Sequence, residues 1–245
     1  MNEKNIIVEV KNLTKVFKNN IAVNKISFDV TKNQVFGILG PNGSGKTTTL
    51  RMMTTILSPT SGEIFIEGKD YKIDPQQIRL DIGYVPQKDA LYGNLTCYEN
   101  LDLFFSAYPY SDNRKNRILE VLDEVDLLDV KNRLARDLSG GMAKRLSIAC
   151  AIVHKPKVVF FDEITMGLDP VARNNIWKLV RKLKDHSTVI MTTHYMDEAE
   201  ELCEELIIMS SGSIIARGNP QEIVKKYHAK GLHEVITLIA KEQDV

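Results

Sequence analysis

Short apolar runs bounded by turn-forming residues dominate the first third of the chain, and each run predicts a β-strand. These runs lie at residues 6–10, 26–30, 35–39 and 63–68. The pair Asn19 and Asn20 and the segment TKN at 31–33 are predicted turns between the early strands. The beginning of the chain is therefore expected to be rich in β-structure.

The pattern changes after about residue 88, where apolar residues recur at three- and four-residue spacing as far as about residue 155. This spacing predicts helices, most clearly over 99–108 and 114–128. Strand patterns return at 157–163, 187–194 and 205–218, with an amphipathic helix at 171–184. Because VVFF and VIM are continuously apolar, these strands are expected in a parallel sheet that is covered on both faces. The pattern predicts an α/β core with a helical insertion.

Composition places the chain among ordinary soluble globular proteins. The 245 residues include 43% hydrophobic and 26% charged residues, and 32 basic residues balance 32 acidic ones. The balance leaves no global positive field, so no nucleic-acid partner is expected. No apolar run is long enough to span a bilayer, and direct membrane insertion is not expected. The three cysteines lack paired spacing, which favours a reducing cytosol.

The segment VFGILGPNGSGKTTTLRMM at 35–53 carries a phosphate-loop pattern. Gly40 is followed by four spacer residues and then by Gly45, Lys46 and Thr47, after a predicted strand and before a helical pattern. Small residues let the backbone amides converge on a phosphate, and the helix N-terminus adds partial positive charge. Lys46 is expected to bridge the β- and γ-phosphates, and Thr47 to bind Mg²⁺.

Two carboxylates end the apolar strand of VVFFDE at 158–163. Asp162 is expected to hold Mg²⁺ at the carboxyl end of this strand, where ligands bind in such sheets. Glu163 is expected to polarise or orient a water for attack on the γ-phosphate. Two solvated carboxylates at a strand end are the alternative, which the phosphate loop makes less favourable.

The segment DLSGGMAKRL at 137–146 opens a predicted helix with two glycines. One interpretation is an N-cap, in which Ser139 accepts a hydrogen bond from an amide of the first turn. The other is a phosphate site, because the amides of Gly140 and Gly141 can approach a phosphate without side chains in the way. Both interpretations use the same atoms.

The order of these motifs resembles the nucleotide-binding subunit of an ATP-binding cassette (ABC) transporter, from about residue 6 to about residue 225. The matching segments are GPNGSGKTT at 40–48, GYVPQ at 83–87, LSGGMAKR at 138–145, FFDE at 160–163, GLDP at 167–170 and TTH at 192–194. The resemblance implies a P-loop NTPase fold with a parallel-sheet core, an N-terminal antiparallel β subdomain and an inserted helical subdomain. It implies one domain over 1–245.

Within that domain the resemblance divides the chain into an ATP-binding core with the β subdomain, a helical subdomain with the signature motif, and a short C-terminal extension. The core takes residues 1–87 and 156–225, the helical subdomain 88–155, and the extension 226–245. Residues 219–245 are long enough for about two helices.

The resemblance also assigns residues to roles. ATP binding is assigned to Phe17, Val23, Gly40, Pro41, Asn42, Gly43, Ser44, Gly45, Lys46, Thr47, Thr48 and Gln87. Catalysis is assigned to Lys46, Glu163 and His194, and Mg²⁺ binding to Thr47, Gln87 and Asp162. The partner subunit's ATP is assigned to Ser139, Gly140, Gly141 and Met142, and dimer contact to Asp169.

Some of these residues have a plainer interpretation on their own. Phe17 is expected to stack on adenine, and a core or strand-end phenylalanine is the alternative. Gln87 and His194 gain their roles only from their place in the series of motifs. Two residues after the acidic strand depart from the family pattern, since Ile164 and Met166 replace a usual proline and a usual small hydroxyl residue. These departures put the shape of loop 164–169 in question.

The resemblance implies a mechanical ATPase that uses ATP and Mg²⁺. It works as a head-to-tail dimer, expected to be a homodimer, and drives transport through a separate integral membrane permease. Met142 in place of a glutamine makes the signature most similar to exporters of the ABC-2 or drug and antibiotic efflux type. YGNLTCYENL at 92–101 is then the expected docking surface for the permease, which would hold the cytoplasmic chain on the inner face of the cell membrane. The alternatives are a soluble ABC-type ATPase of translation, repair or iron–sulfur assembly, and a regulatory module without turnover.

Overall fold

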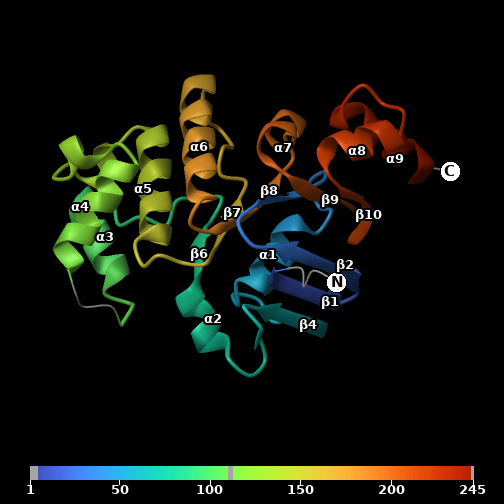
Figure 1. Cartoon of the computed structure of the whole chain (residues 1–245), viewed down its shortest axis with the longest axis horizontal. Coiled ribbons are helices and arrows are strands. Elements are labelled where there is room, and N and C mark those ends of the chain that lie inside the picture. Colours follow the sequence, from blue (N-terminus) through green and yellow to red (C-terminus); the bar gives the residue numbers. More distant parts are fainter. Residues whose placement is uncertain (1–4, 110–112, 244–245) are drawn as a thin grey trace.

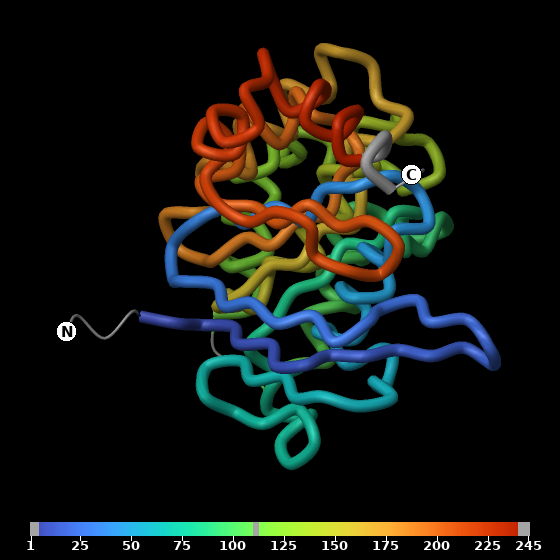
Figure 2. Tube along the Cα trace, turned by 90° about the vertical axis from the view of Figure 1, so that its right-hand side faces the viewer, coloured from blue at the N-terminus to red at the C-terminus, as the bar shows by residue number. Residues whose placement is uncertain are grey.

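The computed structural model describes residues 5–109 and 113–243, and in these ranges the strands form two sheets (Figure 1). The first sheet is antiparallel, with strand order β2-β1-β4-β5. Its strands are β1 (Ile6–Phe17), β2 (Asn20–Thr31), β4 (Ser61–Ile66) and β5 (Lys69–Asp70). Strands β1 and β2 form a long hairpin whose tip projects from the body of the molecule (Figure 2).

The second sheet has the order β10-β9-β3-β8-β7-β6, and its strands are parallel except for the β9–β10 hairpin. These strands are β3 (Val35–Leu39), β6 (Ile82–Val85), β7 (Val158–Asp162), β8 (Thr188–Thr193), β9 (Glu205–Ser210) and β10 (Ser213–Gly218). Every residue of β3, β7 and β8 is buried, which confirms the prediction of strands covered on both faces.

Helices cover this parallel sheet and extend the molecule to either side (Figure 1). The helices next to the sheet are α1 (Lys46–Met53), α2 (Pro75–Asp81), α6 (Pro170–Leu183) and α7 (Met196–Leu202). The C-terminal part forms α8 (Pro220–Lys226) and α9 (Leu232–Gln243), as the length of that segment predicted. No helix among the described residues combines the length and the apolar character that a bilayer crossing requires.

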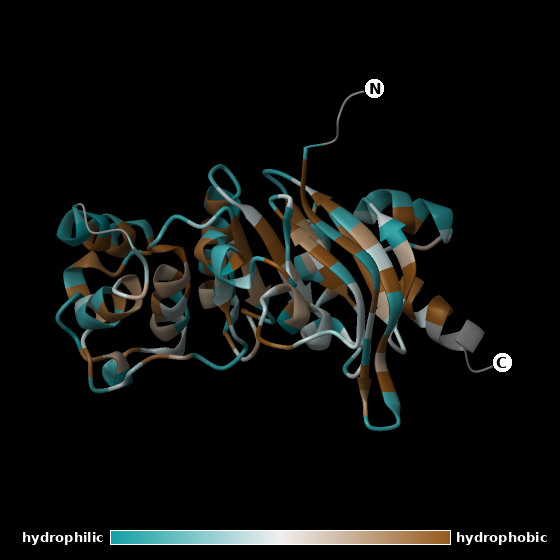
Figure 3. Cartoon of the chain, turned by 90° about the horizontal axis from the view of Figure 1, so that it is seen from below, coloured by the Kyte–Doolittle hydropathy of each residue, from teal (hydrophilic) through white to brown (hydrophobic). Residues whose placement is uncertain are grey.

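The predicted helical insertion forms a separate lobe on one side of the sheet (Figures 1 and 3). Its helices are α3 (Cys97–Phe105), α4 (Arg114–Glu124) and α5 (Gly140–Ile152), with short 3₁₀ turns at Leu128–Val130 and Ala135–Asp137. Leu101, Ile118 and Leu146 are fully buried in the core of this lobe. Thr96 begins α3 through a capping box with Glu99. The apolar spacing therefore predicted this lobe correctly.

The N-terminal strands are longer than predicted. β1 continues to Phe17 because its register shifts between Val10 and Leu13, and Asn12 in this bulge has a φ of 47°. A bulge interrupts the two-residue alternation from which the strand was recognised. The sequence pattern also did not predict β6, which has only four residues, or the short helix α2 before it.

The hydrophobic core lies in two clusters. One fills the space between the two sheets and around α1, and includes Val8, Phe36 and Leu50. The other joins the opposite face of the parallel sheet to α6, α7 and the helical lobe. The alternating hydropathy along β1 and β2 in Figure 3 is typical of strands with one face on the first cluster. This packing leaves the carboxyl ends of β3, β7 and β8 free to carry polar groups.

Candidate nucleotide-binding site

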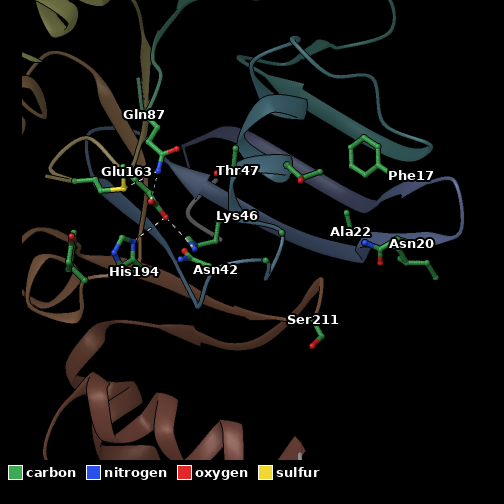
Figure 4. Close-up of a pocket in the computed structure, with 16 residues that line it drawn as sticks. Phe17, Asn20, Ala22, Asn42, Lys46, Thr47, Gln87, Glu163, His194 and Ser211 are labelled. Atoms are coloured by element: carbon green, nitrogen blue, oxygen red, sulfur yellow. Dashed lines mark hydrogen bonds and ion pairs between the residues drawn. The ribbon is translucent and has the colours of Figure 1, made fainter. Parts of the chain in front are cut away.

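A cavity of about 920 Å³ opens at the carboxyl ends of the parallel strands (Figure 4). Its volume suits a small-molecule ligand. Its walls come from the β1–β2 hairpin, the phosphate loop, the segments after β6, β7 and β8, and the β9–β10 turn. The lining residues are Phe17, Asn20, Ile21, Ala22, Asn42, Gly43, Gly45, Lys46, Thr47, Thr48, Gln87, Glu163, Met166, His194, Tyr195 and Ser211.

The phosphate loop ends where α1 begins, and Lys46 is the first residue of that helix. The Lys46 side chain is 4% exposed. Its Nζ donates to the backbone oxygens of Gly40 (2.9 Å) and Pro41 (3.1 Å). Burial lowers the pKa of Lys46, while the nearby carboxylates of Glu163 and Asp162 act in the opposite direction. The ammonium therefore lies across the loop, close to its amides.

Glycine is required at Gly45 of this loop for reasons of backbone geometry. Its φ is 101°, and a Cβ there would lie 2.5 Å from the backbone oxygen of Ala22. Gly45 is also the N-cap of α1, whose first turn has no side-chain cap. The first amides of α1 are thus left uncapped by side chains, as an anion site at a helix N-terminus needs.

Three oxygen-bearing side chains meet beside α1. The Thr47 hydroxyl donates to Oδ1 of Asp162 over 2.9 Å, and the Thr192 hydroxyl donates to the same oxygen over 2.8 Å. Asp162 is 1% exposed. Hydroxyl and carboxylate oxygens are the ligand types that Mg²⁺ prefers, so the side chains of Thr47 and Asp162 fit the predicted metal ligands.

Three polar side chains converge on Glu163 in the part of the cavity next to the phosphate loop (Figure 4). Its Oε1 lies 3.2 Å from Nδ1 of His194 and 3.5 Å from Nζ of Lys46, and its Oε2 accepts from Nε2 of Gln87 over 3.0 Å. The side chain is 8% exposed, and φ is 48°, in the left-handed region. A largely buried carboxylate held by three polar partners is suited to take a proton or to orient a water.

Gln87 links this carboxylate to the helical lobe. Its Nε2 also lies 3.1 Å from Sδ of Met166, and its backbone oxygen accepts from Nζ of Lys144 over 3.0 Å. Lys144 is 5% exposed, lies on α5 and pairs with Asp89 over 2.7 Å. The sequence showed Lys144 next to the signature but not that it anchors the signature helix to the Gln87 segment.

Phe17 lies at the far end of the cavity from Glu163 (Figure 4). It is 45% exposed, and Nζ of Lys15 lies 5.1 Å from its ring centroid. The exposure argues against the alternative of a core phenylalanine, whereas the position of Phe17 as the last residue of β1 fits the alternative of a strand-end phenylalanine, so stacking on adenine stays a prediction. Val23 does not line the cavity, contrary to its assignment to ATP binding, because its side chain is fully buried in the core. The three residues before it, Asn20, Ile21 and Ala22, line the cavity instead.

The other residues of the phosphate loop divide between the cavity wall and its support. Asn42, Gly43 and Thr48 line the cavity, whereas Gly40, Pro41 and Ser44 are not among its lining residues. Gly40 is packed so closely that a Cβ there would lie 2.3 Å from the backbone oxygen of Met209.

The signature residues do not line this cavity. Ser139 is the N-cap of α5, and its Oγ accepts from the amide of Met142 over 3.3 Å, as the N-cap interpretation predicted. Ser139 and Gly140 are exposed. Gly141 has a packing role that the sequence did not reveal, because a Cβ there would lie 3.1 Å from Cβ of Ala172 on α6. The exposed Asp169 caps α6 by accepting from the amides of Val171 and Ala172.

Sequence reasoning missed several residues of the cavity: Asn20, Ile21, Ala22, Met166, Tyr195 and Ser211. Ala22 and Tyr195 adjoin a residue that was recognised, and Asn20, Ile21 and Met166 lie within three residues of one. Ser211 is different, because it lies in the β9–β10 turn, where its φ is 46°. The neighbouring Gly212 donates its amide to the backbone oxygen of Ser44 over 3.1 Å, which holds the turn against the phosphate loop. The SG pair between two strand patterns was the available signal.

Comparison with known proteins agrees with this geometry. Residues 23–166 match the family model described as ABC transporter. The chain is 37% identical over 219 residues to the probable multidrug ABC transporter ATP-binding protein YbhF of Escherichia coli (strain K12), covering 89% of this chain and 38% of that protein. It is 39% identical over 218 residues to the daunorubicin/doxorubicin resistance ATP-binding protein DrrA of Streptomyces peucetius, covering 88% and 66%.

The fold also matches a solved ATP-binding cassette in a dimeric, post-hydrolysis state bound to ADP and Pi. The TM-score is 0.78 and the identity 30%, covering 87% of this chain and 98% of that one. The chain spans less than half of YbhF, so the cassette is the part that the two share. With its phosphate loop, acidic strand and family match together, this chain belongs to the ABC transporter family as an ATP-binding cassette, an ATPase.

Proposed function

We propose that this cassette hydrolyses ATP to drive export through a separate membrane permease. The relatives named for multidrug transport and for daunorubicin/doxorubicin resistance support the direction of transport. The signature with Met142 adds to this support through its similarity to efflux-type exporters. The chain then works on the inner face of the cell membrane, where the permease holds it.

The observation that carries the proposal is the set of partners around Glu163. ATP binds with adenine on Phe17 and its phosphates on the amides of the phosphate loop, where Lys46 neutralises the β- and γ-phosphates. Glu163 takes a proton from the attacking water or orients it, since it lies at the phosphate end of the cavity. His194 and Gln87, within 3.2 Å and 3.0 Å of this carboxylate, keep its position and that of the water.

Mg²⁺ is part of the proposal because the donor set beside α1 fits it. Thr47 and Asp162 would hold the ion, with Gln87, which also lines the cavity, as the further candidate. When bound, the ion supplies neutralisation of phosphate charge. The residues of the chain then orient the nucleotide around it.

The second part of the proposal is a head-to-tail dimer of two copies of this chain. The exposed Ser139 and Gly140 at the N-terminus of α5 do not line the nucleotide cavity that the described residues form. In the dimer this N-terminus covers the γ-phosphate that is bound to the partner subunit, with Asp169 at the same interface. The solved cassette in a dimeric state supports the formation of a dimer.

The permease is proposed to dock on the segment 92–101 and on the groove beside it, between the helical lobe and the core. A cavity of about 230 Å³ lies there, lined by residues that include Tyr84, Leu91, Phe104 and Tyr108. Tyr92, at the edge of this region, is 57% exposed. The groove lies beside Gln87, and Lys144 joins α5 to that residue, so a movement at the docking surface can reach the catalytic carboxylate.

Glu163→Gln tests the catalytic and dimer parts together. The substitution keeps the shape and removes the base, so hydrolysis is expected to fall by at least about 100-fold while ATP binding persists. Light scattering after size-exclusion chromatography should then show a dimer that depends on ATP. Glu201→Gln, on the exposed side of α7, is the matched control and should hydrolyse normally.

Purification of the tagged chain from solubilised membranes tests the transport part. The expected result is one co-purifying membrane protein, released by a charged substitution at Tyr92. Recovery of the chain only with ribosomes, DNA or iron–sulfur proteins would contradict transport, and a Glu163→Gln variant that still hydrolyses ATP would contradict the catalytic assignment.

A further inference from the structure

Glu198 is a carboxylate that lies outside the nucleotide cavity and is fully buried between α6 and α7. Its Oε1 accepts from the hydroxyl of Thr165 over 2.8 Å and from Nε1 of Trp177 over 3.0 Å. Burial raises the pKa of Glu198, and the hydrogen bonds from Thr193, Thr165 and Trp177 and the charge of Arg173 oppose that shift. Burying a carboxylate costs free energy unless hydrogen bonds compensate for the lost water, and Thr165 and Trp177 supply such bonds here.

The partners of Glu198 complete a series of links between two neighbouring segments. The segments follow β7 and β8, which are adjacent parallel strands. The first links are the Asp162–Thr192 hydrogen bond (2.8 Å) and the bond from the Glu163 amide to the Thr192 backbone oxygen (3.1 Å). The Glu163–His194 contact at 3.2 Å comes next. The Thr165–Glu198 bond is the last link, and we call it the outer anchor. The pair Glu163 and His194 therefore lies between the hydrogen bonds to Thr192 and this outer anchor.

The backbone conformation of Glu163 is one that contacts on both sides of the residue must stabilise. A φ of 48° is unfavourable for a residue with a side chain and persists only where the surroundings enforce it. On the strand side, Thr192 accepts from the Glu163 amide through both its backbone oxygen and its hydroxyl. On the other side Thr165, which is 1% exposed, is held by Glu198. Without the outer anchor, residues 163–165 are free to relax away from His194.

We propose that Glu198 is a positioning residue for ATP hydrolysis, which acts through Thr165 to fix the Glu163 carboxylate against His194. Trp177 on α6 holds the Glu198 carboxylate in place from the other side. The inference rests on the proposed roles of Glu163 and His194. It assigns Glu198 no contact with nucleotide. Its effect is on the geometry of the reacting groups, where a displacement of about 1 Å can cost about 100-fold in rate.

Paired substitutions separate positioning from a general structural role. Thr165→Val removes the hydroxyl, and Thr165→Ser keeps it. Glu198→Ala removes the acceptor, whereas Glu198→Gln keeps the shape of the side chain and one oxygen that can accept. We expect Thr165→Val and Glu198→Ala to lower kcat about 10- to 100-fold, with the Kd for ATP within about twofold of the original. Thr165→Ser and Glu198→Gln should recover most of the rate. Glu201→Gln on the same helix should change neither quantity.

Counting nucleotide sites with a fluorescent ATP analogue corrects for any variant that folds poorly, because kcat is then expressed per competent site. A kcat per site within about twofold of the original in both Thr165→Val and Glu198→Ala would overturn the proposal. A loss that Thr165→Ser and Glu198→Gln do not recover would also overturn it.

Hydrogen exchange of the full chain gives a second readout that does not depend on turnover. Amides of residues 163–168 are expected to exchange faster in Thr165→Val than in Thr165→Ser. Equal exchange in the two variants would contradict the anchor. The Glu163→Gln experiment stays independent: an inactive Glu163→Gln with normal Thr165→Val and Glu198→Ala rejects only the positioning role, whereas an active Glu163→Gln rejects the catalytic assignment.

Discussion

The phosphate loop and the signature are both glycine-containing helix starts, yet their surroundings differ. Gly45 begins α1 inside a cavity, and the first turn of that helix has no side-chain cap. Ser139 begins α5 on the surface and caps the amide of Met142 with its own hydroxyl. Two sites that share the physics of a helix N-terminus therefore differ in where their ligand can come from.

The phosphate loop therefore has its charged partners within the described part of the chain, whereas the signature does not. Lys46 lies across the phosphate loop, and Asp162 and Glu163 reach it from β7. Around Ser139 the described residues place no cation or carboxylate in hydrogen-bond contact with the cap. The signature thus offers donors outward, which is the reason for assigning it to the nucleotide of a partner subunit.

Ser139→Arg tests whether the signature acts on the nucleotide of a partner subunit, and we expect it to have the largest effect. A bulky cation at the cap should block closure on the partner's nucleotide and lower hydrolysis by at least about 100-fold. ATP binding by the monomer, measured by fluorescence titration, should stay within about twofold because Ser139 lies outside the cavity. Asn116→Arg, which places the same charge on the exposed side of α4, is the control. Loss of ATP binding by the monomer would mean that the signature acts within its own chain.

Lys46→Ala tests the complementary half. Removing charge-assisted hydrogen bonds to the phosphates should raise the Kd for ATP roughly 10- to 100-fold in the monomer itself. Isothermal titration calorimetry with ATP measures this change, and the exposed Lys115→Ala is the control. An unchanged Kd in the monomer would show that the phosphate loop is not complete without a second subunit.

His154 offers a smaller test of how the signature lobe is joined to the core. It is 4% exposed, its Nε2 lies 2.9 Å from the backbone oxygen of Ile82, and it stacks on Tyr108. Burial, with the charge of Arg117, lowers the pKa of His154 to about 4, although the Ile82 contact and Asp81 act the other way. In the unfolded chain His154 is therefore protonated below about pH 6.5, whereas in the folded chain it is protonated only below about pH 4.

The sign follows from that difference in protonation: the contribution of His154 to stability is present above pH 6.5 and is lost as the pH falls towards 4. Between pH 7.5 and 5.5 this group alone should lower the free energy of unfolding by about 1.4 kcal/mol. Urea unfolding at the two pH values measures it, with His154→Gln as the comparison. An equal pH dependence in both proteins would contradict the assignment.

Local sequence was sufficient where a feature depends on residues close together in the chain. The strand at 35–39, the loop that follows it and the N-cap at Ser139 were predicted because apolar runs, glycine spacing and capping are local properties. The α/β core with a helical insertion followed from the order of strand and helix patterns, whereas the P-loop NTPase fold with its antiparallel β subdomain was implied by the family resemblance. Strand β6 was not predicted, since its four residues, three of them buried, are too few to show a period.

Tertiary structure alone decided which of these residues meet. It turned Val23 into the core and Ala22 towards the cavity, because a bulged strand hides its facing from the sequence. It explained Gly141 by the close approach of α6, and it brought Thr165 to Glu198 across 33 residues. The sequence by itself determined the chemistry that the chain carries. The packing of distant segments determined its geometry, since contacts between elements depend on crossings and registers that no local pattern records.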